Sequence, residues 1–256
     1  MSTYCMSDLH GQYKTFRRML EIISFSKSDT LYILGDVIDR GPDGIKIIQD
    51  IMGMPNVTMF IGNHELLMLD ALANKEALED GSRTDTDDID LWADLCNGGT
   101  PTSDAFASLS AKKRKDIISF IRHSVVAKQI KVGRKSYYLS HAYVTDRRFT
   151  DEIRFDEMTH KEVWDVVWQS VYEPEFVKKK GKALFPDKKK IYVGGHTFTQ
   201  RLDCMDEKGF GKIYHNKNYN GFHVINVDCG MALKNKSSCL GCLRLEDDKE
   251  FYVPLM

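Results

Sequence analysis

Ser7-Asp-Leu-His-Gly11 is the first of three polar segments that each follow directly on a short apolar run. The other two are Gly35-Asp-Val-Ile-Asp-Arg-Gly41 and Gly62-Asn-His-Glu65. Short apolar runs that end in this way are typical of buried strands, and the stretches between them repeat apolar residues at helical spacing. Strands that alternate with helices predict βαβ units and a parallel sheet. The expected strands span residues 3–6, 31–34 and 57–61.

The spacing of the three segments predicts that they meet in space. The intervals from Asp8 to Asp36 and from Asp36 to Asn63 each have room for one helix and one strand. The three segments should therefore lie side by side at the carboxyl edge of the sheet, where ligands of open α/β sheets bind.

The rest of the chain changes character twice. Residues 65–123 have a mainly helical pattern, and a second irregular stretch spans about residues 143–190. We predict one α/β domain over residues 1–256, with cap insertions at about 70–123 and 143–190. Further strands are expected at residues 125–132, 135–139, 191–193, 222–227, 238–245 and 250–253.

The bulk composition excludes several classes of protein. The 256 residues include 36 Lys and Arg against 37 Asp and Glu, which leaves a formal net charge of −1. This balance argues against a protein that coats nucleic acid or is drawn onto an anionic membrane. No run of about 18 apolar residues is present, so we expect no membrane-spanning helix. Six irregularly spaced cysteines and a start without a leader pattern favour a reduced, cytoplasmic protein, with its oligomeric state open.

Later strands add two histidines to the same expected edge. Carboxylate, amide and imidazole ligands without thiolate suit Mn, Fe, Zn or Mg. We expect two divalent ions about 4 Å apart, with manganese as the first choice and a carboxylate between them. Asp36, central in the expected strand order, is the natural bridge. The expected terminal ligands are Asp8 and His10 on one ion, and Asn63, His141 and His196 on the other.

Three neighbouring residues fit the remaining steps of phosphate chemistry. Two ions can aim a bound hydroxide at phosphorus and stabilise the charge that grows on the phosphate. The guanidinium of Arg40 can clamp phosphate oxygens at two points. We expect His64 to protonate the leaving alkoxide, and Asp39 to hold the His64 imidazole in the right tautomer with its pKa high enough to donate.

Taken in order, these motifs resemble the signature of the metallophosphoesterase superfamily. The match extends from Asp8 to Thr197 and is closest to the PPP-type serine/threonine protein phosphatases of bacteria and phages. That group includes lambda phosphatase and the symmetrical diadenosine tetraphosphatases. The resemblance implies an α/β fold, an αββα sandwich with helical cap insertions and a dinuclear metal centre at one edge. Trp92, Asn97-Gly-Gly99 and Thr102 are similar to a cap-region motif of bacterial members.

The chain departs from the family pattern at three places, the first of which is Ile61 before Gly62, where many members have an arginine before the Asn-His-Glu motif. Bacterial members often carry a phosphate-binding arginine where this chain has Trp168-Gln-Ser170, and Tyr143 replaces the usual glycine of a His-Ala-Gly motif. We expect Tyr143 to narrow or reshape the cleft, and Arg147 or Arg148 to supply the second clamp. The expected substrate contacts are Arg40, Asn97, Tyr143, Arg147 and Arg148.

The function expected from these residues is metal-dependent hydrolysis of phosphomonoesters. A phosphoprotein, with phosphoserine or phosphothreonine, is the first choice of substrate. Symmetrical diadenosine tetraphosphate or another nucleotide is the alternative, because the two subgroups share every metal ligand. A non-catalytic interaction module is a third hypothesis, against which the intact ligand set argues.

Overall fold

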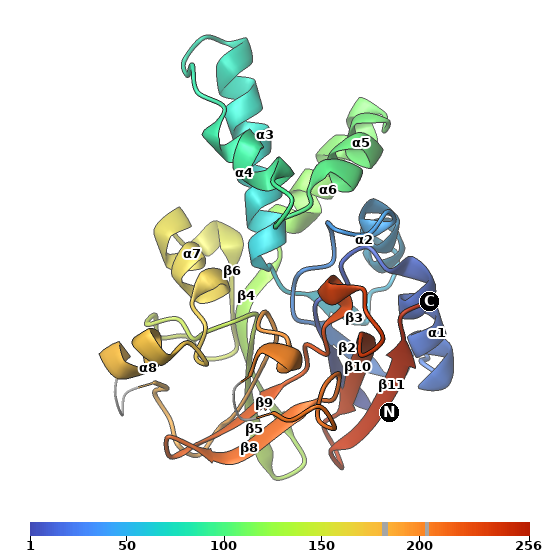
Figure 1. Ribbon diagram of the computed structural model, residues 1–256, viewed down its shortest axis with the longest axis vertical. Coiled ribbons are helices and arrows are strands. Elements are labelled where there is room, and N and C mark those ends of the chain that lie inside the picture. The colour runs from blue at the N-terminus through green and yellow to red at the C-terminus, as the bar shows by residue number, and fades with distance from the viewer. Residues whose placement is uncertain (181–183, 203–204) are drawn as a thin grey trace.

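Two β-sheets lie face to face at the centre of the computed structural model, which describes residues 1–180, 184–202 and 205–256 (Figure 1). Of the six cysteines, Cys204 lies outside these ranges. The first sheet has the order β11-β10-β1-β2-β3 and the second β6-β4-β5-β7-β9-β8. The strands of the first sheet are β1 (Thr3–Met6), β2 (Thr30–Ile33), β3 (Val57–Met59), β10 (Cys239–Arg244) and β11 (Lys249–Pro254). Those of the second are β4 (Val125–Val132), β5 (Lys135–Ser140), β6 (Glu152–Arg154), β7 (Ile191–Gly194), β8 (Tyr214–Tyr219) and β9 (Phe222–Asn226).

Both sheets contain a run of parallel strands. β1 pairs in parallel with β2, and β2 with β3, as the βα rhythm of the sequence predicts. In the second sheet β5, β7 and β9 are parallel neighbours. A bridge between Phe60 and Val125 joins the end of β3 to β4. Parallel strands present their carboxyl ends at one edge, so the six loops that follow these strands are directed toward the same region.

The hydrophobic core has two layers, one between the two sheets and one between the sheets and the helices. Phe60 and the Tyr137 ring are fully buried in the cluster between the two sheets. Met6 and Ile33 belong instead to the cluster that packs under the helices. Because successive strand residues point to opposite faces, one sheet contributes to both layers. This is the αββα arrangement that the family resemblance implies.

Helices cover the first sheet and rise from the gap between the sheets. Helix α1 (Tyr13–Ile22) packs on β10, β11 and α2 (Gly44–Met52). Four helices separate β3 from β4 and project away from the sheets at the top of Figure 1. They are α3 (Asn63–Glu79), α4 (Asp87–Ala93), α5 (Thr100–Ala107) and α6 (Ala111–Arg122). Helices α7 (His160–Trp168) and α8 (Pro174–Lys180) lie between β6 and β7 in the chain.

Two short strands were not predicted from the sequence. β6 is three residues long and lies in a stretch that we expected to be irregular. β8 has the polar sequence Tyr-His-Asn-Lys-Asn-Tyr, without the alternation that marks a half-buried strand. Both are edge strands that form by pairing with β4 and β9, so their tertiary partners determine them.

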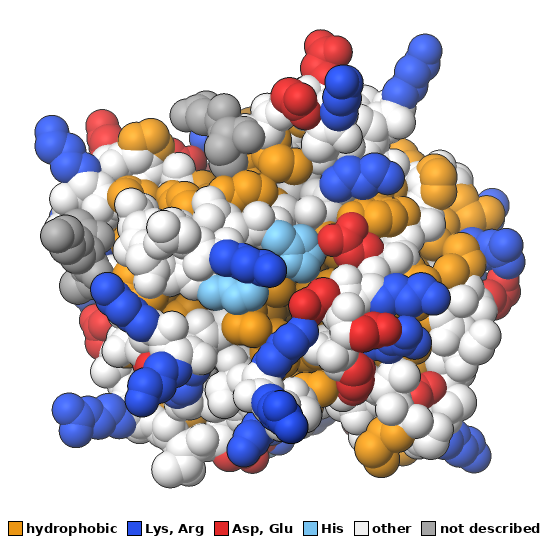
Figure 2. Space-filling model, turned by 90° about the horizontal axis from the view of Figure 1, so that it is seen from below, with side chains coloured by type: hydrophobic (Ala, Val, Ile, Leu, Met, Phe, Trp, Pro, Cys, Tyr) orange, Lys and Arg blue, Asp and Glu red, His pale blue; other side chains and the backbone are white. Residues whose placement is uncertain are grey.

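The distribution of surface charge and the character of the helices match what the composition predicts. Figure 2 shows basic and acidic side chains interspersed over the face turned away from α3–α6. Within the described ranges, no helix combines the length and the apolar character that crossing a bilayer requires.

Truncation of Phe60 tests the inter-sheet core. Phe60→Ala is expected to lower the free energy of unfolding by about 3–5 kcal/mol, because it leaves a cavity where the structure cannot collapse fully. Urea denaturation of the metal-free protein measures this loss. Leu95→Ala, at a side chain that is 98% exposed, is the control and should change the value by less than about 0.5 kcal/mol. Equal losses in the two variants would contradict the assignment of Phe60 to the core.

Candidate metal centre

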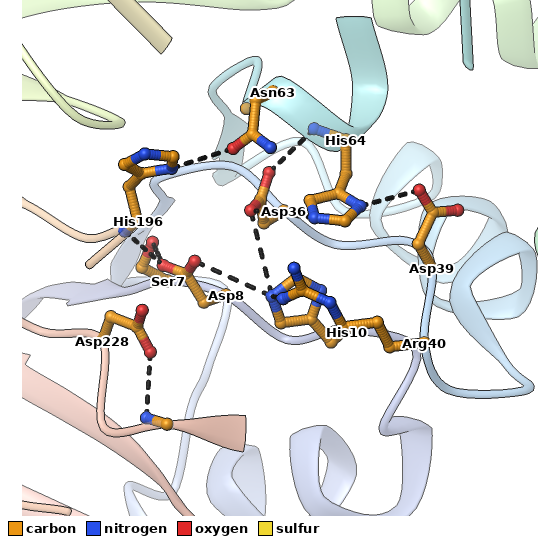
Figure 3. A network of polar contacts seen from close by, with 12 residues as sticks. Ser7, Asp8, His10, Asp36, Asp39, Arg40, Asn63, His64, His196 and Asp228 are labelled. Atoms are coloured by element: carbon orange, nitrogen blue, oxygen red, sulfur yellow. Dashed lines mark hydrogen bonds and ion pairs between the residues drawn. The ribbon is translucent and has the colours of Figure 1, made fainter. Parts of the chain in front are cut away.

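The predicted ligands converge at the edge where the parallel strands of both sheets end (Figure 3). Backbone hydrogen bonds join the loops after β1 and β2: the N–H of His10 donates to the Asp36 carbonyl at 2.9 Å. The loops after β5 and β7 add His141 and His196 from the second sheet. Five of the six side chains are buried and His196 is half-buried. The six are Asp8, His10, Asp36, Asn63, His141 and His196.

Asp36 lies between two groups of possible metal ligands. One group contains His10 and His64, the other contains His141 and His196, and Asp36 belongs to both. Its Oδ2 is 3.9 Å from His10 Nε2, whereas its Oδ1 is 3.5 Å from His141 Nε2. One oxygen of the carboxylate therefore faces each group, which is what a bridging ligand requires.

The second group consists of acceptor atoms that face one another. Nδ1 of His141 lies 2.6 Å from the Leu34 carbonyl oxygen, which can only accept, so the ring proton is on Nδ1 and Nε2 carries a lone pair. That Nε2 lies 3.1 Å from Asn63 Oδ1, and His196 Nδ1 lies 2.9 Å from the same oxygen. Buried lone pairs that converge in this way are favourable around a cation. The donor set therefore fits a divalent metal, with a backbone carbonyl fixing the tautomer of the His141 ring.

The histidines of the two groups are also held in the neutral form that can bind a metal. Nδ1 of His10 is 3.3 Å from the Ile38 carbonyl, which places the lone pair of the neutral ring on Nε2. Burial, helped by the charge of Arg40, holds the pKa of His10 well below its usual value. Burial and His141 lower the pKa of His196 likewise. Neutral imidazole is the form that binds metal.

Asp8 is held from both sheets. Its Oδ2 accepts a hydrogen bond from the backbone N–H of His196 at 3.0 Å and one from the Ser7 hydroxyl. Gly195 packs so closely that a Cβ there would lie 2.2 Å from the same carboxylate oxygen. The loop after β7 and the loop after β1 therefore fix each other.

Glu65 ties the second and third loops together, a role that we did not infer from the sequence. Its carboxylate accepts backbone N–H groups from Asp36 (2.9 Å), Val37 (2.8 Å), Ile38 (3.3 Å) and Gly62 (2.9 Å). The side chain is fully buried at the start of α3. Four donors satisfy a buried carboxylate that would otherwise be costly to bury.

The loops of the centre adopt a backbone conformation that L-residues rarely accept. Positive φ values outside glycine cost about 1–3 kcal/mol each and persist where the surroundings enforce them. Hydrogen bonds such as those of Glu65 supply that enforcement. The site residues with positive φ are Asp8, His10, Asp36, Asp39, Arg40 and His196.

His64 and Asp39 form a buried pair beside the ligands. Nδ1 of His64 is 2.8 Å from Asp39 Oδ2, and its Nε2 has no hydrogen-bond partner among the described residues. Burial alone would lower the pKa of His64, but the charge of Asp36 and the hydrogen bond to Asp39 outweigh it and raise the pKa. The cap holds Asp39 in turn: Trp92 Nε1 donates to Asp39 Oδ2 at 2.9 Å, and Asp39 N–H donates to the Thr102 hydroxyl at 2.9 Å.

Arg40 reaches the first group of ligands from the cap side. Its Nη1 is 2.8 Å from His10 Nε2, and its Nη2 donates to the Cys96 carbonyl at 3.2 Å. The backbone N–H of Arg40 donates to Gly98, and its carbonyl accepts from Lys234 Nζ at 2.5 Å. A Cβ on Gly98 would lie 3.1 Å from Arg40 Cγ. The Asn97-Gly-Gly99 motif of the sequence thus supports Arg40.

A cleft of about 470 Å³ opens beside Arg40. Its walls are mainly apolar, and Arg40 and Lys234 add positive charge. The aromatic ring of Phe198, which is half-buried, lies two residues after His196 in the chain. The lining residues include Arg40, Leu95, Pro101, Phe198, Leu233 and Lys234.

The structure gives Tyr143 a packing role where we expected a substrate contact. Only 4% of the residue is exposed, and its hydroxyl donates to the Leu184 carbonyl at 2.6 Å. Its ring packs edge-on against Phe176, 4.8 Å between centroids, and lies near Phe185. The sequence showed a bulky residue after His-Ala, but only the tertiary packing shows that it is directed into the aromatic core.

Asn97 and Arg147, two further expected substrate contacts, have partners within the protein in this structure. Asn97 donates its side-chain amide to the Leu91 carbonyl at 2.7 Å, inside the cap. Arg147 bonds to the Glu157 carbonyl and lies 3.7 Å from the Glu162 carboxylate. Arg147 and Arg148 are both exposed, and no contact among the described residues joins either one to the metal centre.

Asp228 is a further acidic residue at the centre that the sequence analysis did not assign. It follows β9, the third parallel strand of the second sheet, and is only 2% exposed. An aspartate directly after an apolar strand, in Asn226-Val-Asp228, was the signal that could have identified it. Burial and the charge of Asp8 raise the pKa of Asp228 well above its usual value.

Comparisons with known proteins agree with this geometry. The family model described as calcineurin-like phosphoesterase matches residues 1–200. A symmetrical bis(5'-nucleosyl)-tetraphosphatase of Wigglesworthia glossinidia brevipalpis is 43% identical over 84 residues, 31% of each chain. The namesake from Delftia acidovorans (strain DSM 14801 / SPH-1) is 28% identical over 156 residues, 60% of this chain and 48% of the relative. The chain thus matches less than half the length of these curated relatives.

The fold is also found among solved structures. A proposed diadenosine tetraphosphatase superposes with a TM-score of 0.55 at 14% identity, covering 100% of this chain and 94% of the other. At this identity the likeness concerns the fold alone.

Substitution of the central carboxylate tests the metal centre. Asp36→Asn is expected to lower bound Mn²⁺ from about two ions per chain to nearly none, because Asp36 faces both groups of ligands. Metal analysis after equilibrium dialysis measures the stoichiometry. Asp248→Asn, at an exposed turn between β10 and β11, is the control. Full metal content in Asp36→Asn would exclude the bridging role.

Proposed function

Because the chain belongs to the calcineurin-like phosphoesterase family, we propose that its metal centre hydrolyses phosphate esters with His64 as the general acid. The observation that carries this proposal is the environment of His64 Nε2. This atom is buried and unpartnered among the described residues, 3.8 Å from Asp36 Oδ2, while Asp39 holds the opposite side of the ring. Such a nitrogen is placed to give its proton to a leaving oxygen beside the ligands.

Arg40, His64 and Asp39 each have a separate role in the proposed hydrolysis. Two divalent ions, with Mn²⁺ as first choice, supply charge stabilisation and an acidified water when bound. Arg40 binds phosphate oxygens, since its guanidinium lies at the mouth of the cleft and beside His10. As the oxygen of water bonds to phosphorus, the water gives up a proton to solvent, the bond to the leaving group breaks, and the proton of His64 passes to the leaving oxygen. Asp39 stabilises the imidazolium before this transfer.

For the substrate class, we propose a nucleoside polyphosphate. The cleft beside Arg40 supports this choice, because it joins two cations to an apolar wall with the Phe198 ring. Cations bind additional phosphates, and an aromatic ring stacks on a nucleobase. The tetraphosphatase names of the relatives support the same class.

A phosphoserine or phosphothreonine protein, the first choice from sequence, is the second candidate. The His64–Asp39 pair favours it, because an alkoxide is a poor leaving group that needs a proton more than a nucleotide phosphate does. This candidate uses the same metal ligands and the same Arg40, so only the group beyond the phosphate distinguishes the two substrates.

Replacing His64, the proposed general acid, should lower kcat more for substrates with a poor leaving group than for those with a good one. His64→Asn is expected to lower kcat on a phosphothreonine peptide by about 10²–10³-fold. p-Nitrophenyl phosphate should lose far less, because nitrophenolate leaves without a proton. Steady-state rates with Mn²⁺ compare the two, and metal analysis confirms that the variant keeps its ions. Equal losses on both substrates would exclude His64 as the general acid.

The two substrate classes can be separated on the same enzyme preparation. With Mn²⁺, kcat/KM for diadenosine tetraphosphate is expected to exceed that for a phosphothreonine peptide. Phe198→Leu, which keeps an apolar side chain but removes the ring, should raise KM for diadenosine tetraphosphate about tenfold, the order expected for a stacked base. KM for p-nitrophenyl phosphate should not change, since that substrate has no base. A higher kcat/KM on the peptide would select the phosphoprotein candidate.

A further inference from the structure

Asp228 is a buried carboxylate that the proposed mechanism does not use. It lies after β9, whose parallel neighbour β7 leads to His196. Figure 3 shows it beside Ser7 and Asp8, with its one drawn hydrogen bond directed away from Asp8. The residue is 2% exposed. It therefore stands at the rim of the ligand cluster, on the side of Asp8.

A rigid backbone framework fixes this position. Oδ1 of Asp228 accepts the Gly230 N–H at 2.9 Å, and its own N–H donates to Asn226 Oδ1 at 3.0 Å. Its carbonyl accepts the Thr199 N–H at 3.0 Å, while Asn226 Nδ2 donates to the Thr197 carbonyl at 2.6 Å. The segment just after His196 and the segment around Asp228 are thus held together. Asp228 has no freedom to turn toward solvent.

The carboxylate of Asp228 has no ion-pair partner among the described residues. Asp8 and Asp36 act on it as like charges, and the opposite charge of Arg40 offsets them only in part. A buried carboxylate without a cation is costly, and three in one region repel one another. Two divalent ions on the predicted ligands would remove this cost. The burial of this carboxylate therefore fits a site that binds metal ions.

We propose that Asp228 is a positioning residue of the metal centre, whose negative charge tightens the binding of the ion held by Asp8 and His10. It acts by its charge, from outside the six predicted ligands, while its backbone carbonyl and Asn226 hold the segment just after His196. The inference rests on the proposed metal centre, and it is independent of the substrate class.

Asp228→Asn tests the inference while keeping the size of the side chain and an oxygen for the Gly230 N–H. Titration calorimetry of the full-length chain with Mn²⁺ is expected to show one of two sites weakened by about 10–100-fold, the usual effect of a residue that supports metal ligands. The other site should stay within about threefold. Asp228→Ser repeats the measurement with a second neutral side chain.

A matched control is available at the opposite end of the strands. Asp29 is 9% exposed, accepts hydrogen bonds from Ser2 and Ser26 and directly precedes β2. Asp29→Asn also removes a largely buried carboxylate, but its Mn²⁺ affinities should equal those of the wild type. A loss in Asp29→Asn as large as in Asp228→Asn would overturn the inference, because a general loss of structure would then explain both.

Stability without metal distinguishes a metal role from a structural one. In chelator, Asp228→Asn is expected to melt at the temperature of the wild type or higher, because a buried carboxyl group without an ion-pair partner among the described residues is replaced by a neutral amide. Its rise in Tm on addition of Mn²⁺ should be smaller. Unchanged Mn²⁺ affinity combined with a lower Tm in chelator would overturn the inference and leave Asp228 a structural residue. If the wild type itself bound no Mn²⁺, the proposed function would fail first.

Discussion

The carboxylate of Glu65 is the constraint on which the metal centre depends. It accepts four backbone N–H groups, three from the loop that carries Asp36 and one from Gly62 at the start of α3. Through these bonds the loops after β2 and β3 become one rigid unit. Asp36 can then keep a positive φ, and its two carboxylate oxygens can face two different groups of histidines. If this loop were flexible, Asp36 could turn away from Asp8 and Glu65, the neighbouring carboxylates that repel it.

The helical segment between β3 and β4 forms hydrogen bonds to residues of the candidate metal centre. Trp92 donates to the same Asp39 oxygen that holds His64, and the backbone at Gly98 holds that of Arg40. The segment that borders the cleft therefore also orients His64, the proposed general acid, and Arg40, the proposed phosphate clamp. For this reason, a change of cap sequence that alters substrate choice should also affect turnover, because both depend on the same few contacts.

Much of this arrangement could be predicted because it depends on local patterns. The strands β1 to β3, the helices between them and the polar segments after each strand follow from short-range periodicity and spacing. The expected substrate contacts of Tyr143 and Arg147 stay predictions, because nothing in their local sequence shows where the side chain packs. Tyr143 is directed into an aromatic cluster by Phe176 and Phe185, and Arg147 is engaged by the segment that leads into α7.

The sequence by itself determined the parallel sheet, the candidate ligands and the pairing of His64 with Asp39, because these follow from residue type and order along the chain. Only the tertiary structure decided which atoms face one another. It showed lone pairs that converge on one point, Glu65 as the tie between loops and Asp228 as a third buried carboxylate. The physical reason is that the burial of a side chain and the balance of charges around it depend on all the groups packed nearby. Those groups come from residues that are far apart in the sequence.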